Sequence, residues 1–311
     1  MLPYLLILGG LVLLYFGAEW MVGGSSKLAV RFGVKPVLVG LTIVAFGTSA
    51  PELVVSIHST VTGVGGIAVG NVIGSNIFNV ALILGLSAMI RPIHITEQLI
   101  RVDVPVVIGA SFLMTYLLWD RTVAILEGVI LLILLVVYMS FTIISAKREK
   151  DSQEKPEKLF GKKDPFVKDI ALIVIGLVLL VGGARVLVNG AVTLATRFGV
   201  SEAVIGLTIV SIGTSLPELA TSVVAALKRH NDIAVGNIIG SNLFNIFSIL
   251  GFAGILGPVV GVGIELRDLF VMLLVTVLLL PMLWTRFTLT RYEGAVLFMI
   301  FLGYIYMVWP K

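Results

Sequence analysis

The chain has 311 residues, of which 58% are hydrophobic and 13% are charged, and its formal net charge is +4. A soluble protein carries roughly 25% charged residues, so this composition excludes an ordinary soluble domain and indicates a membrane protein. The absence of cysteine excludes disulfides and thiolate metal sites. The basic residues are not interleaved with aromatic residues as in a nucleic-acid groove, so no nucleic-acid partner is expected.

Apolar stretches long enough to cross a bilayer, about 20 residues each, recur along the whole chain. In chain order the predicted spans are 4–24, 36–58, 66–90, 99–118, 123–146, 167–189, 202–227, 233–256, 267–284 and 291–309. No basic region precedes the first stretch, so we do not expect a cleaved signal peptide. The sequence therefore predicts an all-α integral membrane protein with ten transmembrane helices in the lipid bilayer.

The second half of the chain repeats the first half at an offset of 166 residues. Between 35–90 and 201–256, 26 of 56 positions are identical. The predicted copies are residues 1–146 and 167–311, joined by a linker at 147–166. Because each copy has five spans, an odd number, the second copy is expected to enter the membrane upside down. Many secondary transporters have such inverted-topology repeats, with a binding site near the midplane where the copies meet.

The positions of the lysines and arginines predict the orientation. Eight of the 22 lie between 147 and 168, and 17 of the 22 lie in the linker and in loops on the same side. By the positive-inside rule this side is cytoplasmic. We therefore expect a multi-pass cell-membrane protein with both termini outside and a basic cytoplasmic linker at 147–166, which is too short and too charged to form a domain.

Each copy carries one acid in a predicted broken helix. The sequences GTSAPE at 47–52 and GTSLPE at 213–218 place Glu52 and Glu218 inside apolar spans. An acid at mid-membrane depth costs roughly 2.5–3.5 kcal/mol and usually has a function. Pro51 and its counterpart remove a helical N–H, so helices 2 and 7 are predicted to be discontinuous. Backbone groups freed at this depth must be satisfied by protein, water or an ion.

Hydroxyl and amide side chains accompany each acid. They lie three or four residues before it on the same helix face, or at i, i+4 and i+8 on the next helix. The set is Thr48, Ser49, Asn71, Ser75 and Asn79 in the first copy, and Thr214, Ser215, Asn237, Ser241 and Asn245 in the second. The pairs Gly70/Gly74 and Gly236/Gly240 predict close helix packing. Since no Lys or Arg lies at the depth of the acids, a mobile hard cation, which prefers oxygen ligands, is the expected counter-ion.

These paired motifs resemble the alpha-repeats of sodium/calcium exchangers, within the calcium/cation antiporter superfamily. The motifs are GTSAPE and GTSLPE, each followed by GSN-x-FN at 74–79 and 240–245. The resemblance covers the whole chain, and the short linker is similar to that of compact prokaryotic members. It implies a secondary antiporter, not an enzyme, that exchanges three Na⁺ for one Ca²⁺ by alternating access, without a cofactor or an obligatory protein partner.

The resemblance also implies the ion ligands. For Ca²⁺ they are Glu52, Glu218, Thr48 and Thr214. For Na⁺ they are Ser49, Ser215, backbone oxygen near Ala45 and Ser211, Ser75, Asn79, Ser241 and Asn245. Asparagine at 245, where potassium-dependent relatives tend to carry Asp, implies independence of K⁺. From the residues alone, a site charge of −2 is balanced by one Ca²⁺ or two Na⁺, so these ions are expected to compete; a third Na⁺ makes exchange electrogenic.

Three alternatives remain open at this level. The first is a proton-coupled Ca²⁺/cation antiporter on the same fold, because buried carboxylates also bind protons. The second is an ion channel and the third an intramembrane hydrolase; broken helices with a tight, oxygen-rich site favour a carrier over both. Glu127 and Glu293 correspond in the repeat but lie near span ends, so an interfacial role is expected for them, and Glu19 is assigned none.

Overall fold

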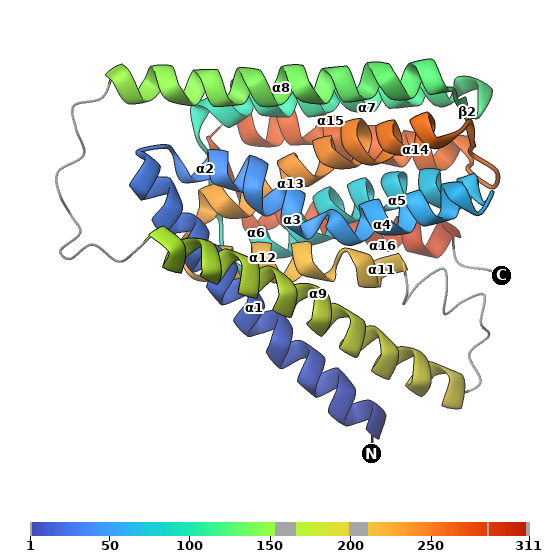
Figure 1. Ribbon diagram of the computed structural model, residues 1–311, viewed down its shortest axis with the longest axis horizontal. Helices are drawn as coiled ribbons and strands as arrows, with labels where there is room; N and C mark the ends of the chain where they lie inside the picture. The colour runs from blue at the N-terminus through green and yellow to red at the C-terminus, as the bar shows by residue number, and fades with distance from the viewer. Residues whose placement is uncertain (1, 153–165, 199–210, 285, 309–311) are drawn as a thin grey trace.

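The computed structural model describes residues 2–152, 166–198, 211–284 and 286–308, and this part of the chain is almost entirely helical (Figure 1). Among these described residues, eight helical runs are long and apolar enough to cross a membrane, and a ninth is a bent pair, Pro36–Thr48 and Ala50–Val61. A shorter apolar helix follows at Leu216–Leu227. The predicted all-α membrane class is therefore confirmed, while residues 202–210 of the predicted seventh span lie outside the described residues.

The first half, as described over residues 2–152, contains twelve helical segments. They are α1 (Leu2–Phe32), α2 (Pro36–Val39), η1 (Gly40–Val44), α3 (Ala45–Thr48), α4 (Ala50–Val61), α5 (Gly65–Ile77), η2 (Phe78–Leu84), α6 (Gly85–Ile90), η3 (Leu99–Asp103), α7 (Val104–Leu117), η4 (Leu118–Asp120) and α8 (Ile125–Ser152). Two short strands, β1 (Ile93–His94) and β2 (Thr122–Val123), flank α7 and its neighbouring turns.

The described part of the second half follows the same order. Its helices are α9 (Phe166–Arg197), α11 (Ser211–Thr214), α12 (Leu216–Leu227), α13 (Asn231–Leu243), η6 (Phe244–Ile249), α14 (Leu250–Leu256), α15 (Leu266–Trp284) and α16 (Arg291–Val308). The strands are β3 (Val259–Val260) and β4 (Thr288–Leu289). The segments η1, η2, η3 and η6 are π-helical, a geometry that is frequent at functional sites.

Three helices extend beyond the predicted apolar spans. Helix α1 ends at Phe32 and α9 ends at Arg197, eight residues beyond the predicted ends 24 and 189 in each case. Helix α8 continues to Ser152, past the predicted boundary at 146, and residues 153–165 of the predicted linker lie outside the described residues. In α8 the residues past the apolar pattern, 147–152, are KREKDS, and Lys, Arg and Glu are good helix formers that extend the helix.

Several contacts between the two halves occur in equivalent pairs: shifting both residues of one contact by 166 positions, each into the other half, gives a second contact. Strand β1 pairs antiparallel with β4, and β2 pairs antiparallel with β3. Adding 166 to β1 gives β3 and adding 166 to β2 gives β4, so each pairing is the counterpart of the other. The backbone of Gly85 likewise meets that of Gly294, and Gly128 meets Gly251, which are again equivalent pairs.

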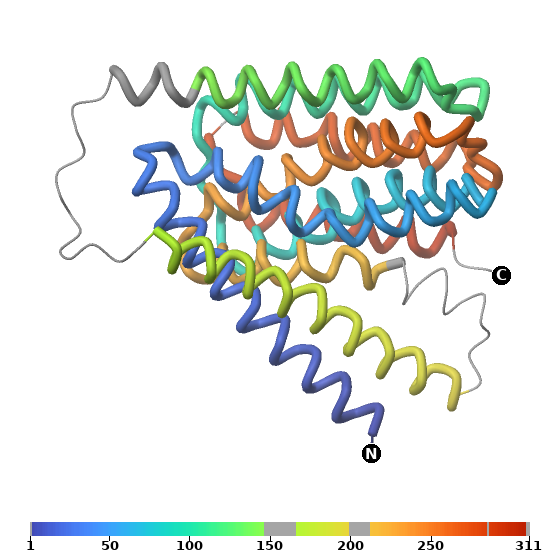
Figure 2. The backbone as a smooth tube through the Cα atoms, viewed as in Figure 1, coloured from blue at the N-terminus to red at the C-terminus, as the bar shows by residue number. Residues whose placement is uncertain are grey.

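The longest helices, α1 and α9, lie side by side along one edge of the molecule (Figure 2). They cross at glycines: a Cβ on Gly17 would lie 2.8 Å from the Gly176 carbonyl, and one on Gly183 would lie 3.0 Å from the Gly10 carbonyl. Helix α8 lies along the opposite edge, and α5 and α13 lie between (Figure 1). The runs through α5 and α13 are the most buried of the candidate spans.

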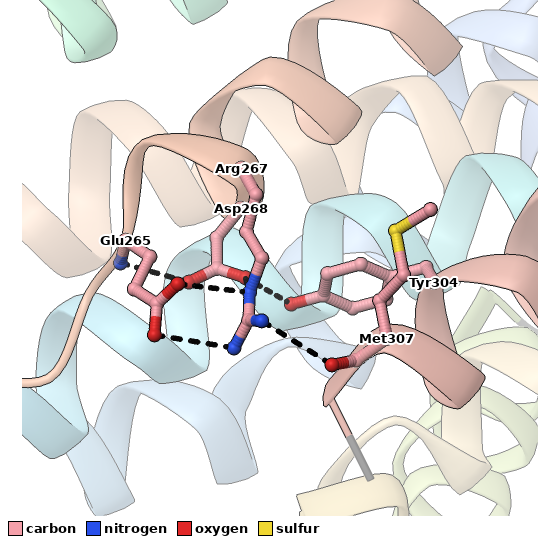
Figure 3. Close-up of polar contacts among 5 residues, drawn as sticks. All are labelled: Glu265, Arg267, Asp268, Tyr304 and Met307. Atoms are coloured by element: carbon pink, nitrogen blue, oxygen red, sulfur yellow. Dashed lines mark hydrogen bonds and ion pairs between the residues drawn. The ribbon is translucent and has the colours of Figure 1, made fainter.

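Peripheral helices are joined by tyrosine–aspartate hydrogen bonds. Tyr138 Oη on α8 donates to Asp103 Oδ1 at 2.9 Å, and its repeat counterpart, Tyr304 on α16, donates to Asp268 Oδ1 at 3.2 Å. Figure 3 shows the second bond, together with Arg267, which contacts Glu265 and the Met307 carbonyl. These bonds satisfy buried carboxylate oxygens at helix ends and hold the outer helices around the central ones.

Candidate ion-binding site

Both broken helices turn at a serine. Ser49 (φ −80°, ψ 3°) lies between α3 and α4, and the two parts of that span are bent by 44°. Ser215 (φ −92°, ψ 8°) separates α11 from α12 in the same way. A proline follows in the first turn of each next helix, where no N–H is needed. Glu52 and Glu218 lie in these first turns, where the helix dipole favours a negative charge.

The two acids are connected across the repeat by the two serines. Ser215 Oγ donates to Glu52 Oε1 at 2.8 Å, and Ser49 Oγ donates to Glu218 Oε1 at 3.0 Å. The offset of 166 residues converts one bond into the other. Glu52 and Glu218 also interact electrostatically. The structure thus brings the acids and serines of both motifs, predicted from the sequence to lie together, into one place.

Both carboxylates are buried without a cationic partner among the described residues. Each glutamate is 1% exposed, and neither forms an ion pair in the described part of the chain. Every buried charged side chain in that part is an acid. The second oxygen, Oε2, of each glutamate accepts no hydrogen bond there. A buried carboxylate with a free oxygen is costly unless something positive reaches it.

Amide side chains form a second layer of contacts between the halves. Asn79 Nδ2 donates to Asn242 Oδ1 at 3.0 Å, and Asn245 Nδ2 donates to Asn76 Oδ1 at 3.0 Å. These bonds are again equivalent under the repeat. Ser75 Oγ lies 3.2 Å from Ser215 Oγ. Ser75 therefore lies beside one acid–serine pair, and Asn79 and Asn245 join the two halves.

The remaining predicted residues occupy distinct positions. Thr48 is fully buried, and its hydroxyl lies 3.1 Å from Asn237 Oδ1 and 3.4 Å from the Ala45 carbonyl oxygen. Ser241 is buried, and Thr214 is half-buried at the end of α11. Ser211 begins α11, but its side chain lies outside the described residues.

A set of buried oxygen atoms has no hydrogen-bond partner in the described part of the chain. Five of these atoms belong to the motif residues predicted from the sequence, namely Glu52 Oε2, Glu218 Oε2, Asn79 Oδ1, Asn245 Oδ1 and Ser241 Oγ. Carboxylate, amide and hydroxyl oxygens are the ligands that hard cations such as Ca²⁺ prefer. Burying such atoms unpaired is unfavourable, so this donor set fits one or more hard cations.

The glycines of α13 bring it against the first part of the broken span. A Cβ on Gly236 would lie 2.6 Å from the Val37 carbonyl oxygen, and one on Gly240 would lie 2.6 Å from the Leu41 carbonyl oxygen. The predicted close packing is confirmed for this pair. The counterpart pair, Gly70 and Gly74, has no comparably close backbone neighbour among the described residues.

Sequence reasoning missed Asn76 and Asn242. Both lie off the i, i+4, i+8 face that contains Asn79 or Asn245. The helix becomes π-helical at Phe78 and at Phe244, which changes the angular relation between neighbouring side chains. The available signal was the middle asparagine of each GSN-x-FN motif, which is repeated like the rest.

Three other acids have structural partners. Glu127 Oε2 accepts from the Ala124 N–H at 2.7 Å, and Glu293 Oε2 accepts from the Thr290 N–H at 2.7 Å. Each carboxylate therefore caps the start of its helix, α8 or α16, in the way of a capping box. Glu19, for which the sequence indicated no role, forms an ion pair of 2.5 Å with Lys228.

Comparison with known proteins gives consistent results. The model of the family described as "Sodium/calcium exchanger protein" matches residues 2–144 and 168–309. The putative antiporter CaxA of Alkalimonas amylolytica is 39% identical over 98% of both chains. The sodium/calcium exchanger MaX1 of Methanosarcina acetivorans is 32% identical over 97% of both. Structures of the sodium-calcium exchanger NCX_Mj, soaked with Na⁺ and Sr²⁺ or Ca²⁺, match with a TM-score of 0.87 at 31% identity; the first covers 99% of both chains.

Proposed function

We propose that this chain, which belongs to the sodium/calcium exchanger protein family, exchanges Na⁺ for Ca²⁺ across a membrane. The chain is a multi-pass membrane protein and a cation antiporter of that family. The finer proposal is an alternating-access mechanism with Na⁺ as the coupling ion, electrogenic and independent of K⁺. The pair of buried glutamates with free Oε2 atoms is the observation that carries it.

Charge balance explains the coupling. Two ionised carboxylates give the site a charge of −2, which one Ca²⁺ or two Na⁺ neutralise. An empty site leaves two unpaired charges at low dielectric, where the desolvation cost is several kcal/mol per ion. The reorientation of an empty site is therefore unfavourable, so one ion species must replace the other. A third bound Na⁺ gives the cycle a net charge movement.

The proposed ligands are those of the sequence motifs. Ca²⁺ is bound by the two glutamates and the two threonines, Glu52, Glu218, Thr48 and Thr214. Na⁺ is bound around them by Ser49, Ser215, the backbone at Ala45 and Ser211, Ser75, Asn79, Ser241 and Asn245. The unpartnered oxygens of Asn79, Asn245 and Ser241 support this set.

We further propose ten spans in two inverted five-helix repeats, 1–146 and 167–311, around a cytoplasmic linker. This arrangement is supported by the strand pairings and the serine–glutamate bonds, because in each case the offset of 166 residues converts one contact between the halves into the other. In Figure 1 the end of α8 and the start of α9 lie at the left of the molecule, whereas the start of α1 and the end of α16 lie to the right. Both termini then lie outside, since the basic residues of the linker favour the cytoplasm.

The decisive experiment is ⁴⁵Ca²⁺ uptake into proteoliposomes that contain the purified protein. An outward Na⁺ gradient at clamped pH is expected to drive uptake equally with and without K⁺. Uptake that follows a pH gradient and ignores Na⁺ would select the proton-coupled alternative. Strong dependence on K⁺ would refute the claim of K⁺ independence.

Charge-neutral variants test the site. Glu52→Gln and Glu218→Gln each remove one unit of charge and are expected to abolish Ca²⁺ uptake. Glu127→Gln is the matched control, because glutamine also fits the capping position at the start of α8 and lies outside the site. Wild-type uptake by Glu218→Gln would remove this residue from the site.

A further inference from the structure

The geometry points to Asn76 and Asn242 as positioning residues for the ion site. They orient the carboxamides of Asn245 and Asn79 so that each presents its oxygen, rather than its NH₂ group, to the ion. This inference rests on the proposed function, since it concerns the same site. Neither asparagine belongs to the ligand set proposed above.

A carboxamide has two ends of nearly equal shape and opposite chemistry. Its oxygen accepts hydrogen bonds and binds cations, whereas its NH₂ group only donates. A rotation of about 180° exchanges the two ends, so an asparagine near a cation is a good ligand in one orientation and a repulsive neighbour in the other. Something must therefore fix the rotation before the side chain serves as a ligand.

The cross-repeat bonds supply that constraint. Asn245 Nδ2 is held by Asn76 Oδ1, and Asn79 Nδ2 is held by Asn242 Oδ1, both at 3.0 Å. With the NH₂ groups engaged, the oxygens Asn245 Oδ1 and Asn79 Oδ1 are the free ends, and neither has a partner in the described part of the chain. All four side chains are 1% exposed, so water does not compete for these groups.

The anchoring atom always comes from the other half of the chain. Asn76 lies on α5 and holds Asn245 on η6, whereas Asn242 lies on α13 and holds Asn79 on η2. Each half therefore sets the orientation of a ligand that belongs to its counterpart. Partners that orient a metal ligand in this way typically matter 10–100-fold for ion affinity, although they do not touch the ion.

A double-mutant cycle separates orientation from direct binding and from packing. Asn76→Leu removes the acceptor while keeping the size of the side chain, and Asn245→Leu removes the oriented ligand itself. Affinity for Na⁺, the ion that Asn245 is proposed to bind, is measured from the Na⁺-induced rise in melting temperature of the purified protein, with Na⁺-driven ⁴⁵Ca²⁺ uptake as the second readout. We expect each single variant to weaken Na⁺ binding about 10-fold.

The combination of the two changes is the critical measurement. If Asn76 acts through Asn245, the double variant binds Na⁺ within about 2-fold of Asn245→Leu alone, because the effects share one cause. An additive loss of about 100-fold would overturn the inference, since it would mean that Asn76 contributes independently of Asn245. Asn76→Asp keeps an acceptor in the same place and is expected to restore affinity; failure of this rescue also counts against the inference.

Two controls make the outcome unambiguous. Thr276→Val removes a buried hydroxyl that bonds only to its own helix, at Met272 O, and is expected to leave Na⁺ affinity unchanged. Glu52→Gln tests the proposed function itself: if it keeps the wild-type Ca²⁺ response, the site as a whole is misassigned. If Glu52→Gln abolishes the response and the asparagine cycle is additive, only the positioning role fails.

Discussion

Close contact between α13 and the first part of the broken span makes Gly240 a sensitive test of the site. A Cβ at this position would lie 2.6 Å from the Leu41 carbonyl oxygen and 2.7 Å from Ala45 Cβ. Carbon atoms in contact prefer about 3.5 Å, so Gly240→Ala requires the helices to separate by about 0.8 Å. The obstructing atoms belong to backbone or to a short rigid side chain, so no flexible group moves aside.

That separation displaces ion ligands as well as helices. Helix α13 carries Ser241 and Asn237, and Asn237 Oδ1 contacts Thr48 Oγ1 across the same interface. Overpacking of this kind costs about 1–3 kcal/mol. If ion binding must restore the native spacing, a cost of about 2 kcal/mol weakens affinity by about 30-fold.

The measurement is the half-saturating Ca²⁺ concentration for Na⁺-driven uptake, with protein stability recorded in parallel by thermal unfolding. Gly109→Ala is the matched control, because no atom of the described residues lies within 4 Å of a Cβ at this position on α7. Alanine there is expected to be neutral or slightly stabilising. If Gly240→Ala shows the same half-saturation as Gly109→Ala, the helix spacing does not control the site and the reasoning is refuted.

Two further predictions concern contacts outside the site. Asp169→Asn breaks the ion pair with Arg31 (2.8 Å) at a carboxylate that is 1% exposed, and it is expected to lower the free energy of unfolding by about 1–3 kcal/mol. Glu97→Gln, in the exposed pair with Arg101, is expected to lower it by less than about 0.5 kcal/mol. Equal losses in the two variants, measured by thermal unfolding, would contradict the role of burial. Tyr304→Phe removes the hydroxyl that donates to Asp268 but leaves the donor Glu265 N–H in place (Figure 3). The free energy of unfolding is therefore expected to fall by about 1 kcal/mol or less, with unchanged Ca²⁺ uptake. A change in the half-saturating Ca²⁺ concentration would contradict a purely structural role for this bond.

The sequence predicted the features that depend on local chemistry and on the repeat. Glycine, proline and serine at equivalent positions predicted both broken helices, and Glu52 and Glu218 were expected in one place because equivalent positions of two halves meet. The structure confirms the breaks and links the two acids through Ser215 and Ser49. These predictions succeed because each uses a pattern within about six residues together with the offset of 166 residues.

Features that depend on tertiary geometry were not predictable. The π-helical turns at Phe78 and Phe244 have no signature in the apolar pattern, so Asn76 and Asn242 were missed. Glu127 and Glu293 were expected at the membrane interface, and their capping bonds appear only when the helix start is known. The ion pair of Glu19 with Lys228 joins residues 209 positions apart and has no repeat counterpart.

Two classes of contact in this protein differ in whether they follow the repeat. The serine–glutamate and asparagine–asparagine bonds convert into one another under the repeat. The ion pairs do not, because the counterparts of Arg31–Asp169 and Glu19–Lys228 are Arg197–Pro3 and Arg185–Thr62, and Pro3 and Thr62 carry no charge.

Under the proposed alternating access, the inward-facing and outward-facing states differ in which half takes which conformation. If the two halves were identical, these states would have equal energy, so contacts that are equivalent under the repeat cannot favour one of them. Any difference between the two states must come from contacts that break the repeat. The ion pairs that hold α1 to α9 and to the end of α12 are of this kind. Both involve basic residues that the charge pattern assigns to the cytoplasmic side, so we expect this side of the α1–α9 pair, rather than the ion site, to set the balance between states.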